Sequence, residues 1–314
     1  MARTVLITGA NGSLGLAAVS YLLSTYPSHT LLLTVRNPSS SDLNTSKLRK
    51  IIAKHPNAMV HIETLDLASL AELALFCQKL HADIGSGKTP RIAAIIFNVI
   101  TWSLNSGVRF SKDGLELDMA VNTLPHFNII LSDTHWPGKA GFEIVPPAIP
   151  EDLDNLVKYE KDKPGEEAGR GFLRYGLSRL VGIMLTYELN RRLQRDPKLA
   201  NIRTLAVDPG GLLDSRAFAQ SDMPFTWKIS VAIAYFIQPL LKRFKPRMNT
   251  SAGAAKDVVD MAVAEEFAGK EGHFVMRDQE ESSPDSLDER MQGRLFAKSV
   301  EWCKIKQENT VLAL

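Results

Sequence analysis

The chain contains 314 residues, of which 23% are charged and 45% are hydrophobic, and its formal net charge is +2. This apolar content is too high for a disordered polymer, and the balanced charge gives no support for nucleic-acid binding, which needs a basic excess on one face. The length suits either one large α/β domain or two smaller ones.

Short apolar strands alternate with amphipathic helices along the first hundred residues. Continuous apolar strands of this kind, separated by helices, predict a parallel sheet that is covered on both faces. Strands are expected at Val5–Thr8, Thr30–Val35, Val60–Leu65 and Ile92–Phe97, and helices at Leu14–Leu23, Lys47–Ala53 and Ser69–Leu80.

The second half of the chain is less regular. Proline, glycine and charged residues concentrate in Pro137–Gly171, which predicts an inserted loop region with a short helix near Glu151–Val157. A long helix (about Gly171–Leu193) and a strand (Ile202–Val207) follow, and then further helices and a strand at His273–Met276. The expected organisation is one domain over 1–314, with an insertion at 132–170, a substrate lid at 210–250 and a C-terminal helix at 284–308.

The first predicted strand runs into three glycines, Gly9, Gly12 and Gly15, each separated by two residues. Glycine lets a backbone turn sharply and approach a pyrophosphate closely, and the N-terminus of the following helix adds N–H groups and a positive dipole. Three glycines also occur in ordinary tight loops. The strand before them and the helix after them favour a dinucleotide site.

The second predicted strand ends at Val35-Arg36-Asn37. A site for NAD usually places an acidic residue here, where it holds the ribose hydroxyls. Arg36 would instead pair with a 2′-phosphate through its planar, always-charged guanidinium. The sequence therefore predicts NADP(H), and the alternative is a solvated arginine at the end of a strand.

Five motifs, in order between Thr4 and Met276, resemble those of the short-chain dehydrogenase/reductase family. The motifs are Leu65-Asp66-Leu67, Phe97-Asn98-Val99, Val121-Asn122, Tyr175-x-x-x-Arg179 and Asp208-Pro209-Gly210. The resemblance implies an α/β fold with a single Rossmann-like, doubly wound parallel sheet, an insertion before the catalytic helix and a helical C-terminal lid. It also implies that the cofactor is bound by Thr8, Gly9, Asn11, Gly12, Leu14, Gly15, Arg36, Asp66, Leu67, Asn98, Tyr175, Arg179, Pro209 and Gly210.

The same resemblance implies a catalytic set made of Asn122, Ser132, Tyr175 and Arg179. Residues at positions i and i+4 share one face of a helix, and a cation one turn away favours the ionised form of a phenol. Such a tyrosine can protonate a carbonyl oxygen while hydride arrives at the carbon. The alternative for Tyr175 and Arg179 is a packed helix tyrosine with a surface arginine.

Four departures from the family pattern affect this prediction. Arg179 stands where the family has lysine, and an arginine does not release its proton near neutrality. Val99-Ile100 replaces a small Ala-Gly pair, so these side chains either face away from the cofactor or alter its binding. Pro125 lies three residues after Asn122 and predicts that the helix carrying Asn122 kinks or ends there. Very little chain separates Asn122 from Ser132, and the segment 128–131 is the one strand candidate between them, so part of the helix end and of the fifth strand is expected to be shortened or lost.

The leading functional hypothesis is NADPH-dependent reduction of a ketone or aldehyde on a lipophilic, specialised-metabolite substrate, with Tyr175 as general acid. The alternatives are a non-redox isomerisation or cyclisation on the same fold, and a catalytically impaired pseudoenzyme. The expected partner is a lipophilic small molecule rather than a nucleic acid, and the chain is expected to be a monomer or a dimer.

Two further features bear on location and partners. No secretory signal precedes the first strand, which predicts a cytoplasmic protein. The apolar stretch Trp227–Leu241, followed by Lys242-Arg243-Phe244-Lys245, resembles an interfacial amphipathic helix, so peripheral membrane contact through 227–245 is a second expectation. The alternative for this stretch is a lid helix with a basic end.

The remaining reactive side chains give no metal or redox motif. Cys77 and Cys303 lie in apolar helical patterns and are expected to be buried free thiols. The seven histidines are scattered, without the spacing of a metal site. His126 and His135 flank the segment 128–131 and are expected to be solvated loop residues, with a position at the pocket as the alternative.

Overall fold

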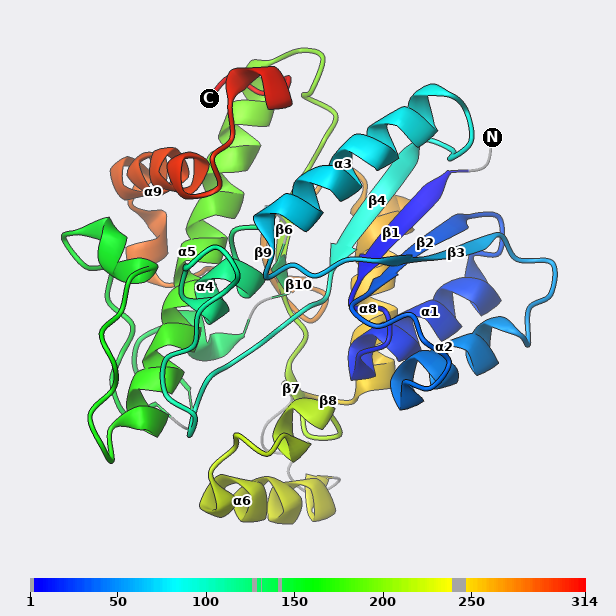
Figure 1. The fold of residues 1–314 in the computed structure, drawn as a ribbon. Coiled ribbons are helices and arrows are strands. Elements are labelled where there is room, and N and C mark those ends of the chain that lie inside the picture. The colour runs from blue at the N-terminus through cyan, green and yellow to red at the C-terminus, as the bar shows by residue number, and fades with distance from the viewer. Residues whose placement is uncertain (1–2, 126–128, 131, 141–142, 239–246) are drawn as a thin grey trace. The chain divides into compact units, whose positions relative to one another are not determined.

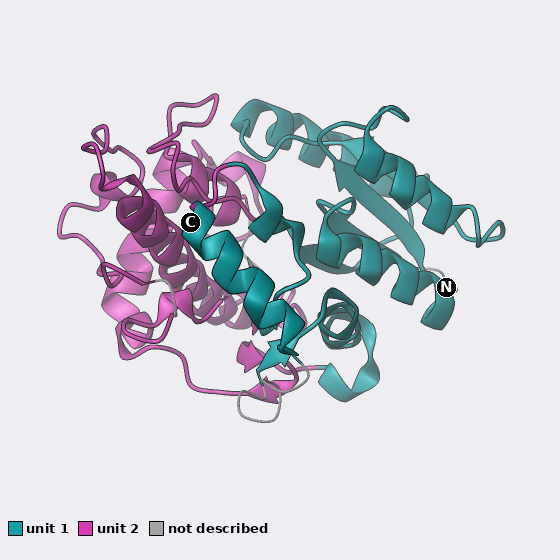
Figure 2. Cartoon of the chain, turned by 90° about the horizontal axis from the view of Figure 1, so that it is seen from below, with its two compact units in different colours: residues 1–99, 209–221, 225–268 teal, residues 100–208, 222–224, 269–314 magenta. Residues whose placement is uncertain are grey.

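The computed structural model describes residues 3–125, 129–130, 132–140, 143–238 and 247–314. The chain divides into two compact units, which are coloured separately in Figure 2. The first unit contains 1–99, 209–221 and 225–268, and the second contains 100–208, 222–224 and 269–314.

The first unit is built on a four-stranded parallel sheet in the order β3-β2-β1-β4 (Figure 1). Every residue of β1 and β2 is buried, because these strands are apolar on both faces and occupy the middle of the sheet. The strands are β1 (Thr4–Thr8), β2 (Thr30–Val35), β3 (Val60–Thr64) and β4 (Ile92–Phe97), and the helices between them are α1 (Ser13–Thr25), α2 (Leu43–Ile52) and α3 (Leu70–Gly85).

Later parts of the chain complete the first unit. The helix α8 (Ser251–Val263) packs against α1, where the hydroxyls of Tyr21 and Tyr26 both bind Oδ1 of Asp260, at 3.0 and 2.8 Å. The short strands β7 and β8 pair in parallel. The remaining elements of this unit are β7 (Gly211–Leu212), a 3₁₀ turn (Arg216–Ala219), α6 (Phe225–Phe236), β8 (Met248–Asn249) and a 3₁₀ turn (Glu265–Phe267).

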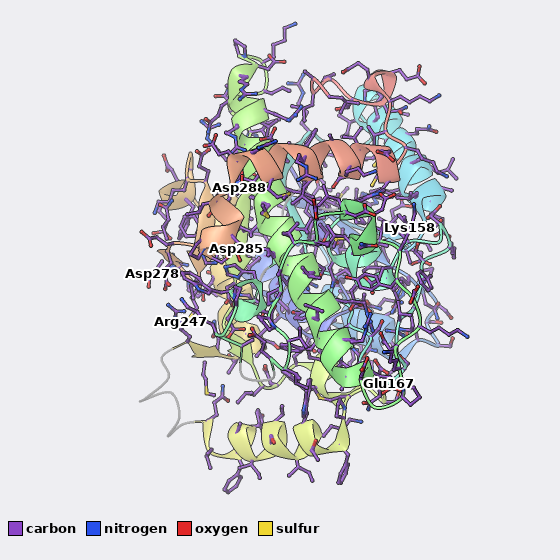
Figure 3. The ribbon with its side chains drawn as sticks, turned by 90° about the vertical axis from the view of Figure 1, so that its left-hand side faces the viewer. Lys158, Glu167, Arg247, Asp278, Asp285 and Asp288 are labelled. Atoms are coloured by element: carbon purple, nitrogen blue, oxygen red, sulfur yellow. The ribbon has the colours of Figure 1, made fainter. Side chains whose placement is uncertain are left out.

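The second unit contains a sheet in the order β10-β9-β6-β5, in which only the β10–β9 pair is antiparallel. Its core surrounds the 29-residue helix α5 (Glu167–Arg195), whose first residue is labelled in Figure 3. The other elements are α4 (Leu117–Asn122), β5 (Ile129–Ile130), β6 (Leu205–Asp208), β9 (Gly272–Val275), β10 (Asp278–Gln279) and α9 (Glu289–Trp302), with 3₁₀ turns at Asp133–His135, Leu153–Leu156, Pro284–Leu287 and Gln307–Asn309.

The predicted α/β, Rossmann-like class with a parallel sheet is confirmed, and β2 and β4 have the expected bounds. The helix that carries Asn122 ends at that residue, three residues before Pro125, in agreement with the early end predicted from the proline. The short helix expected near Glu151–Val157 is instead a 3₁₀ turn, which the side chain of Asp152 caps.

One prediction about the cysteines is wrong. Cys77 is exposed, because α3 buries none of its residues although its apolar residues recur with helical spacing. Cys303 is partly buried just after α9, and burial raises the pKa of its thiol to about 12. None of the described helices combines the length and the apolar character that crossing a bilayer requires.

Candidate functional site

The turn between β1 and α1 is tight enough to require glycine. Gly9 has a φ angle of 60°, in the left-handed region, and a Cβ atom on Gly15 would lie 2.6 Å from the carbonyl oxygen of Gly9. Gly12 caps α1 without a side-chain hydrogen bond, and the first turn of α1 contains no acidic residue. The helix N-terminus therefore keeps the N–H groups and positive dipole that suit the pyrophosphate of a dinucleotide.

Two residues at the end of β4 hold this turn in place. The side-chain amide of Asn98 donates to the carbonyl oxygen of Gly9 at 3.0 Å, and its backbone N–H donates to Oγ1 of Thr8 at 3.1 Å. The side chain of Val99 packs on the turn, since a Cβ on Gly9 would lie 2.7 Å from its Cγ2. Asn98 therefore positions the turn, and Val99 faces it.

Asn11 links the glycine turn to the segment that follows β2. Its side-chain amide donates to Oγ1 of Thr45 at 3.0 Å, and that hydroxyl donates to the carbonyl oxygen of Asn37 at 2.7 Å. Arg36, directly before Asn37, is exposed at the end of β2. An exposed guanidinium in this place, with no acidic residue beside it in the strand, suits the 2′-phosphate of NADP(H).

Asp66 and Leu67 follow β3 at the same edge of the sheet. One carboxylate oxygen of Asp66 accepts the backbone N–H of Ala68 at 3.1 Å, which fixes the turn after the strand. The side chain of Leu67 is buried in the core of the first unit. Of this pair, the partly exposed Asp66 is the better candidate for contact with an adenine.

Arg216 is a contact to the glycine turn that the sequence analysis missed. Its guanidinium donates to the carbonyl oxygen of Asn11 at 2.6 Å, and its backbone N–H donates to Oγ of Ser13 at 3.0 Å. Burial lowers the pKa of the Arg216 guanidinium, and the charge of Asp42 opposes this effect. The one sign of this contact in the sequence is the position of a cation seven residues after Pro209.

The Pro209-Gly210 turn has the backbone that the motif requires. Gly210 has a φ angle of 79°, and a Cβ at this position would collide with the carbonyl oxygen of Arg247. The side-chain amide of Asn249 donates to the carbonyl oxygen of Pro209 at 3.1 Å. The turn is therefore held closely against the pair formed by β7 and β8.

Asn122 is fully buried at the end of α4, where its side-chain amide joins three segments of the second unit. Its Oδ1 accepts the backbone N–H of Thr101 at 2.8 Å, and its Nδ2 donates to the carbonyl oxygen of Thr101 at 2.8 Å. The same Nδ2 donates to Oγ of Ser178, on α5, at 3.1 Å. Asn122 thus fixes the loop around Thr101 to α5.

Tyr175 and Arg179 lie one turn apart on α5, and both are buried, with 5% and 1% of their surfaces exposed. The guanidinium carbon of Arg179 lies 4.8 Å from the centre of the Tyr175 ring, so the cation faces the aromatic ring. Trp102 meets the same ring edge-on, with the two ring centres 5.5 Å apart. The tyrosine is therefore enclosed by a cation and an indole.

Ser132 begins the 3₁₀ turn that packs against α5 beside Tyr175. Its hydroxyl donates to Oδ1 of Asp133 at 3.1 Å. A Cβ on Gly176 would lie 3.0 Å from the carbonyl oxygen of Thr134, which shows how closely this turn approaches the helix. All four predicted catalytic residues lie in the second unit, and the predicted cofactor residues other than Tyr175 and Arg179 lie in the first.

The prediction that His135 is solvated is wrong, because only 2% of its surface is exposed. Its Nδ1 lies 2.7 Å from the carbonyl oxygen of Ser132, and its ring centre lies 5.0 Å from that of His273. Burial lowers the pKa of His135 to about 4, and the charges of His273 and Lys139 act in the same direction. His135 is therefore neutral at pH 7 and supports the turn that begins at Ser132. His126 lies outside the described residues.

Acid should destabilise the protein through this histidine. The unfolded chain binds a proton at His135 below pH 6.5, whereas the folded chain binds it only near pH 4, so stability falls as the pH decreases across this window. Between pH 7.5 and pH 5, His135 should account for a loss of roughly 2 kcal/mol in the free energy of unfolding. Urea unfolding at the two pH values measures this loss.

A His135→Asn variant should have a smaller difference in stability between the two pH values, because asparagine offers an amide donor but does not titrate. The exposed His81 provides the matched control, and His81→Asn should leave the pH dependence unchanged. Equal pH dependence in the wild type and His135→Asn would contradict the assignment.

A buried ion cluster precedes Tyr175 and was also missed. The guanidinium of Arg174 binds both carboxylate oxygens of Asp162, at 2.8 Å each, and Nε of Arg174 lies 3.7 Å from Oε1 of Glu116. Asp118 is fully buried nearby and accepts the backbone N–H of Ser103 at 3.3 Å. Burial raises the pKa of Glu116 to about 7 and raises that of Asp118 as well. The cluster joins α4, α5 and the loop around Ser103.

Comparisons with known proteins give one family model and several relatives. Residues 224–312 match the model described as the AcuH dehydrogenase domain. The chain is 26% identical to the short-chain dehydrogenase iccH of Talaromyces variabilis, across 98% of both chains. Its fold is similar to those of an actinorhodin polyketide ketoreductase variant solved with NADPH and an NADPH-bound carbonyl reductase from chicken fatty liver.

The two structural likenesses concern the fold. The ketoreductase is 14% identical, with a TM-score of 0.55 over 87% of this chain and 95% of that chain. The carbonyl reductase is 17% identical, with a TM-score of 0.51 over 87% of this chain and 91% of that chain. The sequence likeness to the fungal dehydrogenase extends over nearly the whole of both proteins.

Proposed function

We propose that this chain, which belongs to the short-chain dehydrogenase/reductase family of oxidoreductases, uses NADPH to reduce a ketone or aldehyde on a lipophilic substrate. The observation that carries the proposal is the buried Tyr175–Arg179 pair on α5, with Asn122 and the turn beginning at Ser132 packed on the same helix. This arrangement offers one hydroxyl to donate a proton, that of Tyr175, and one to hold the carbonyl oxygen, that of Ser132, as reduction of a carbonyl requires.

The first unit supplies residues that fit the cofactor. The glycine turn and the N-terminus of α1 would hold the pyrophosphate, Arg36 would hold the 2′-phosphate, and Asp66 would contact the adenine. The reduced nicotinamide, when bound, supplies the hydride that adds to the carbonyl carbon. Arg216, bound to the carbonyl oxygen of Asn11, would add a second positive charge at the pyrophosphate.

The second unit supplies the proton. Tyr175 donates its phenolic proton to the carbonyl oxygen, so that hydride and proton together give the alcohol. Arg179, held against the ring, stabilises the negative charge that the phenol acquires, but it does not pass a proton onward at neutral pH. Ser132 orients the carbonyl oxygen, and Asn122 keeps α5 and the loop around Thr101 in register.

The lipophilic, specialised-metabolite substrate is supported by the relatives that the chain resembles. The comparisons include short-chain dehydrogenases from filamentous fungi and a polyketide ketoreductase, whose name states that it acts on a polyketide. Trp102, with 6% of its surface exposed, meets Tyr175 edge-on, so a ring-containing ketone that reaches the phenol would meet an aromatic side chain.

A non-redox isomerisation or cyclisation is the second candidate, and two observations favour it. Val99 packs on Gly9 at the glycine turn, where the family has a small residue. Arg179 replaces the family lysine and cannot relay a proton. Substrate conversion in the absence of any nicotinamide would support this candidate. If the protein neither converts substrate nor binds a nicotinamide, a pseudoenzyme would be supported instead.

An Arg36→Ala variant tests the cofactor assignment. Removing the guanidinium should weaken NADPH binding by roughly 10- to 100-fold, because a charge-assisted pair with the phosphate contributes about 1.5–3 kcal/mol. The affinity for NADH should change little, since NADH has no 2′-phosphate. Titration of the fluorescence of each nucleotide measures both affinities.

Arg49 gives a matched control for Arg36→Ala. Arg49 lies on α2, and its guanidinium donates at 3.0 Å to the carbonyl oxygen of Pro38, which follows β2 and Arg36. Arg49→Ala should leave the preference for NADPH intact. Equal loss of NADPH affinity in both variants, or none in Arg36→Ala, would disprove the role given to Arg36.

A further inference from the structure

The helix α6 is apolar on two opposite faces. Trp227, Val231 and Ala234 form its less exposed face, and Val231 retains only 7% of its surface. Phe225, Ile229, Ile233 and Phe236 recur at positions i, i+4, i+8 and i+11 on the other face, with 75%, 46%, 57% and 86% of their surfaces exposed. Side chains extend from opposite sides of this helix in Figure 3.

This outward face concentrates apolar surface that a soluble protein ordinarily buries. Tyr235 and Ile237 are exposed as well, so six large apolar side chains of the described chain lie in solvent within 225–237. Single exposed apolar residues are common, but a contiguous apolar patch marks a surface that binds a partner. The less exposed face accounts for the attachment of α6 to its own unit, and the outward face needs a separate explanation.

The charge of the surrounding sequence indicates what the partner is. The chain as a whole is nearly neutral, yet the sequence from 223 to 256 contains no aspartate or glutamate. Its cations are Lys228 and Arg247, which the structure describes, Lys242, Arg243 and Lys245, which lie outside the described residues, and Lys256, which is paired with Asp260. An apolar surface within a wholly basic stretch is complementary to an anionic lipid surface, which offers negative headgroups above hydrocarbon.

We propose that α6 docks in the plane of an anionic membrane surface through Phe225, Ile229, Ile233 and Phe236. Its 12 residues are too few to cross a bilayer, so the helix lies in the interface. Docking places the protein at the bilayer, in which a lipophilic substrate dissolves. The proposal rests on the exposed apolar side chains of α6 and on the basic sequence around them, and it requires neither the cofactor nor the reductase activity.

Vesicle binding tests the proposal directly. The protein should co-sediment with vesicles of phosphatidylcholine containing 20% phosphatidylserine, and much less with pure phosphatidylcholine. Raising the salt concentration should weaken the binding, because the electrostatic part is screened. A Phe225→Ser/Phe236→Ser variant should have at most roughly a tenth of the wild-type affinity for the anionic vesicles, since both aromatic anchors are lost.

A control variant with two equally exposed apolar residues separates docking from general stickiness. Met59 and Leu75, with 61% and 65% of their surfaces exposed, lie in the first unit outside α6, and Met59→Ser/Leu75→Ser should bind vesicles as the wild type does. Circular dichroism should show that both double variants remain folded. The single variant Phe236→Ser disturbs α6 less than the double variant does. If it also binds the anionic vesicles more weakly than the wild type, local unfolding of α6 does not explain the loss.

Three outcomes would overturn the proposal. The first is no binding of the wild-type protein to anionic vesicles, and the second is equal binding by the α6 variant and the control variant. The third is a concentration-dependent dimer in light scattering that the α6 variant abolishes, without vesicle binding, since the face would then join two copies of the chain. An intact NADPH affinity in any of these cases would leave the proposed reductase function unaffected.

Discussion

Replacing Tyr175 with phenylalanine should decrease the rate of carbonyl reduction by roughly 10²- to 10⁴-fold, the usual contribution of a positioned general acid. The substitution removes the phenolic hydroxyl alone. The phenylalanine ring can keep its edge-on contact with Trp102 and its contact with the guanidinium of Arg179. The fold should therefore change little, and the main loss should appear in kcat.

Tyr187 on the same helix provides the matched control. Its hydroxyl binds Oγ of Ser282 at 2.9 Å, and burial raises the pKa of that hydroxyl, so it holds structure rather than a reactive proton. Tyr187→Phe should retain most of the turnover. Steady-state rates measured by NADPH absorbance decide the matter, and undiminished reduction by Tyr175→Phe would exclude tyrosine as the acid.

The second large effect concerns stability, and Arg174→Gln should lower the free energy of unfolding by about 3–5 kcal/mol. Arg174 is the fully buried cation of a cluster in which the side chains of Asp162, Glu116 and Asp118 are also buried. Removing the guanidinium leaves these carboxylates without their compensating charge. Urea unfolding followed by circular dichroism measures the loss.

Arg170 provides the matched control, because the same Arg→Gln substitution there removes a surface guanidinium and should lower the free energy of unfolding less. It donates to the same carboxylate of Asp162 at 2.9 Å, but 41% of its side chain is exposed, so Arg170→Gln should cost no more than about 1 kcal/mol. Acid should partly rescue Arg174→Gln, because burial already raises the pKa of Glu116 to about 7 and a protonated carboxyl no longer needs a cation. Equal losses in the two variants at pH 7 would contradict the role of burial.

Much of the fold could be predicted because its signals are local. The strands β2 and β4 are continuous apolar runs between turns, and their bounds agree with the prediction. Pro125 correctly predicted the end of α4, since proline cannot continue a helix in that place. Of the strand expected at 128–131, the structure describes Ile129–Ile130, and these residues form β5.

The candidate site was less predictable, because burial of polar groups depends on tertiary packing. The sequence places Tyr175 and Arg179 on one helix face, but it contains no sign that Trp102 closes over the ring. His135 resembles a loop histidine, and only its packing against His273 and the turn at Ser132 makes it a buried, neutral group. The roles proposed for Tyr175 and Ser132 stay predictions until they are measured.

The environments of two arginines, Arg174 and Arg216, could not be predicted for the same reason. Arg174 stands between Leu173 and Tyr175 with no acidic residue beside it in the sequence, yet only 1% of its surface is exposed and its partners are Asp162 and Glu116. Arg216 contacts the glycine turn across more than 200 residues of sequence. Neither position carries a local motif, because the partners come from distant segments.

Asp222, which lies between β7 and α6, is fixed to the loop around Leu104. The carboxylate of Asp222 accepts the backbone N–H groups of Leu104 and Ser106, each at 2.6 Å. Because the same loop carries Trp102, releasing the two backbone N–H groups from Asp222 should also loosen the indole that meets the ring of Tyr175, so the order of the Tyr175 side chain depends on a carboxylate 47 positions further along the chain.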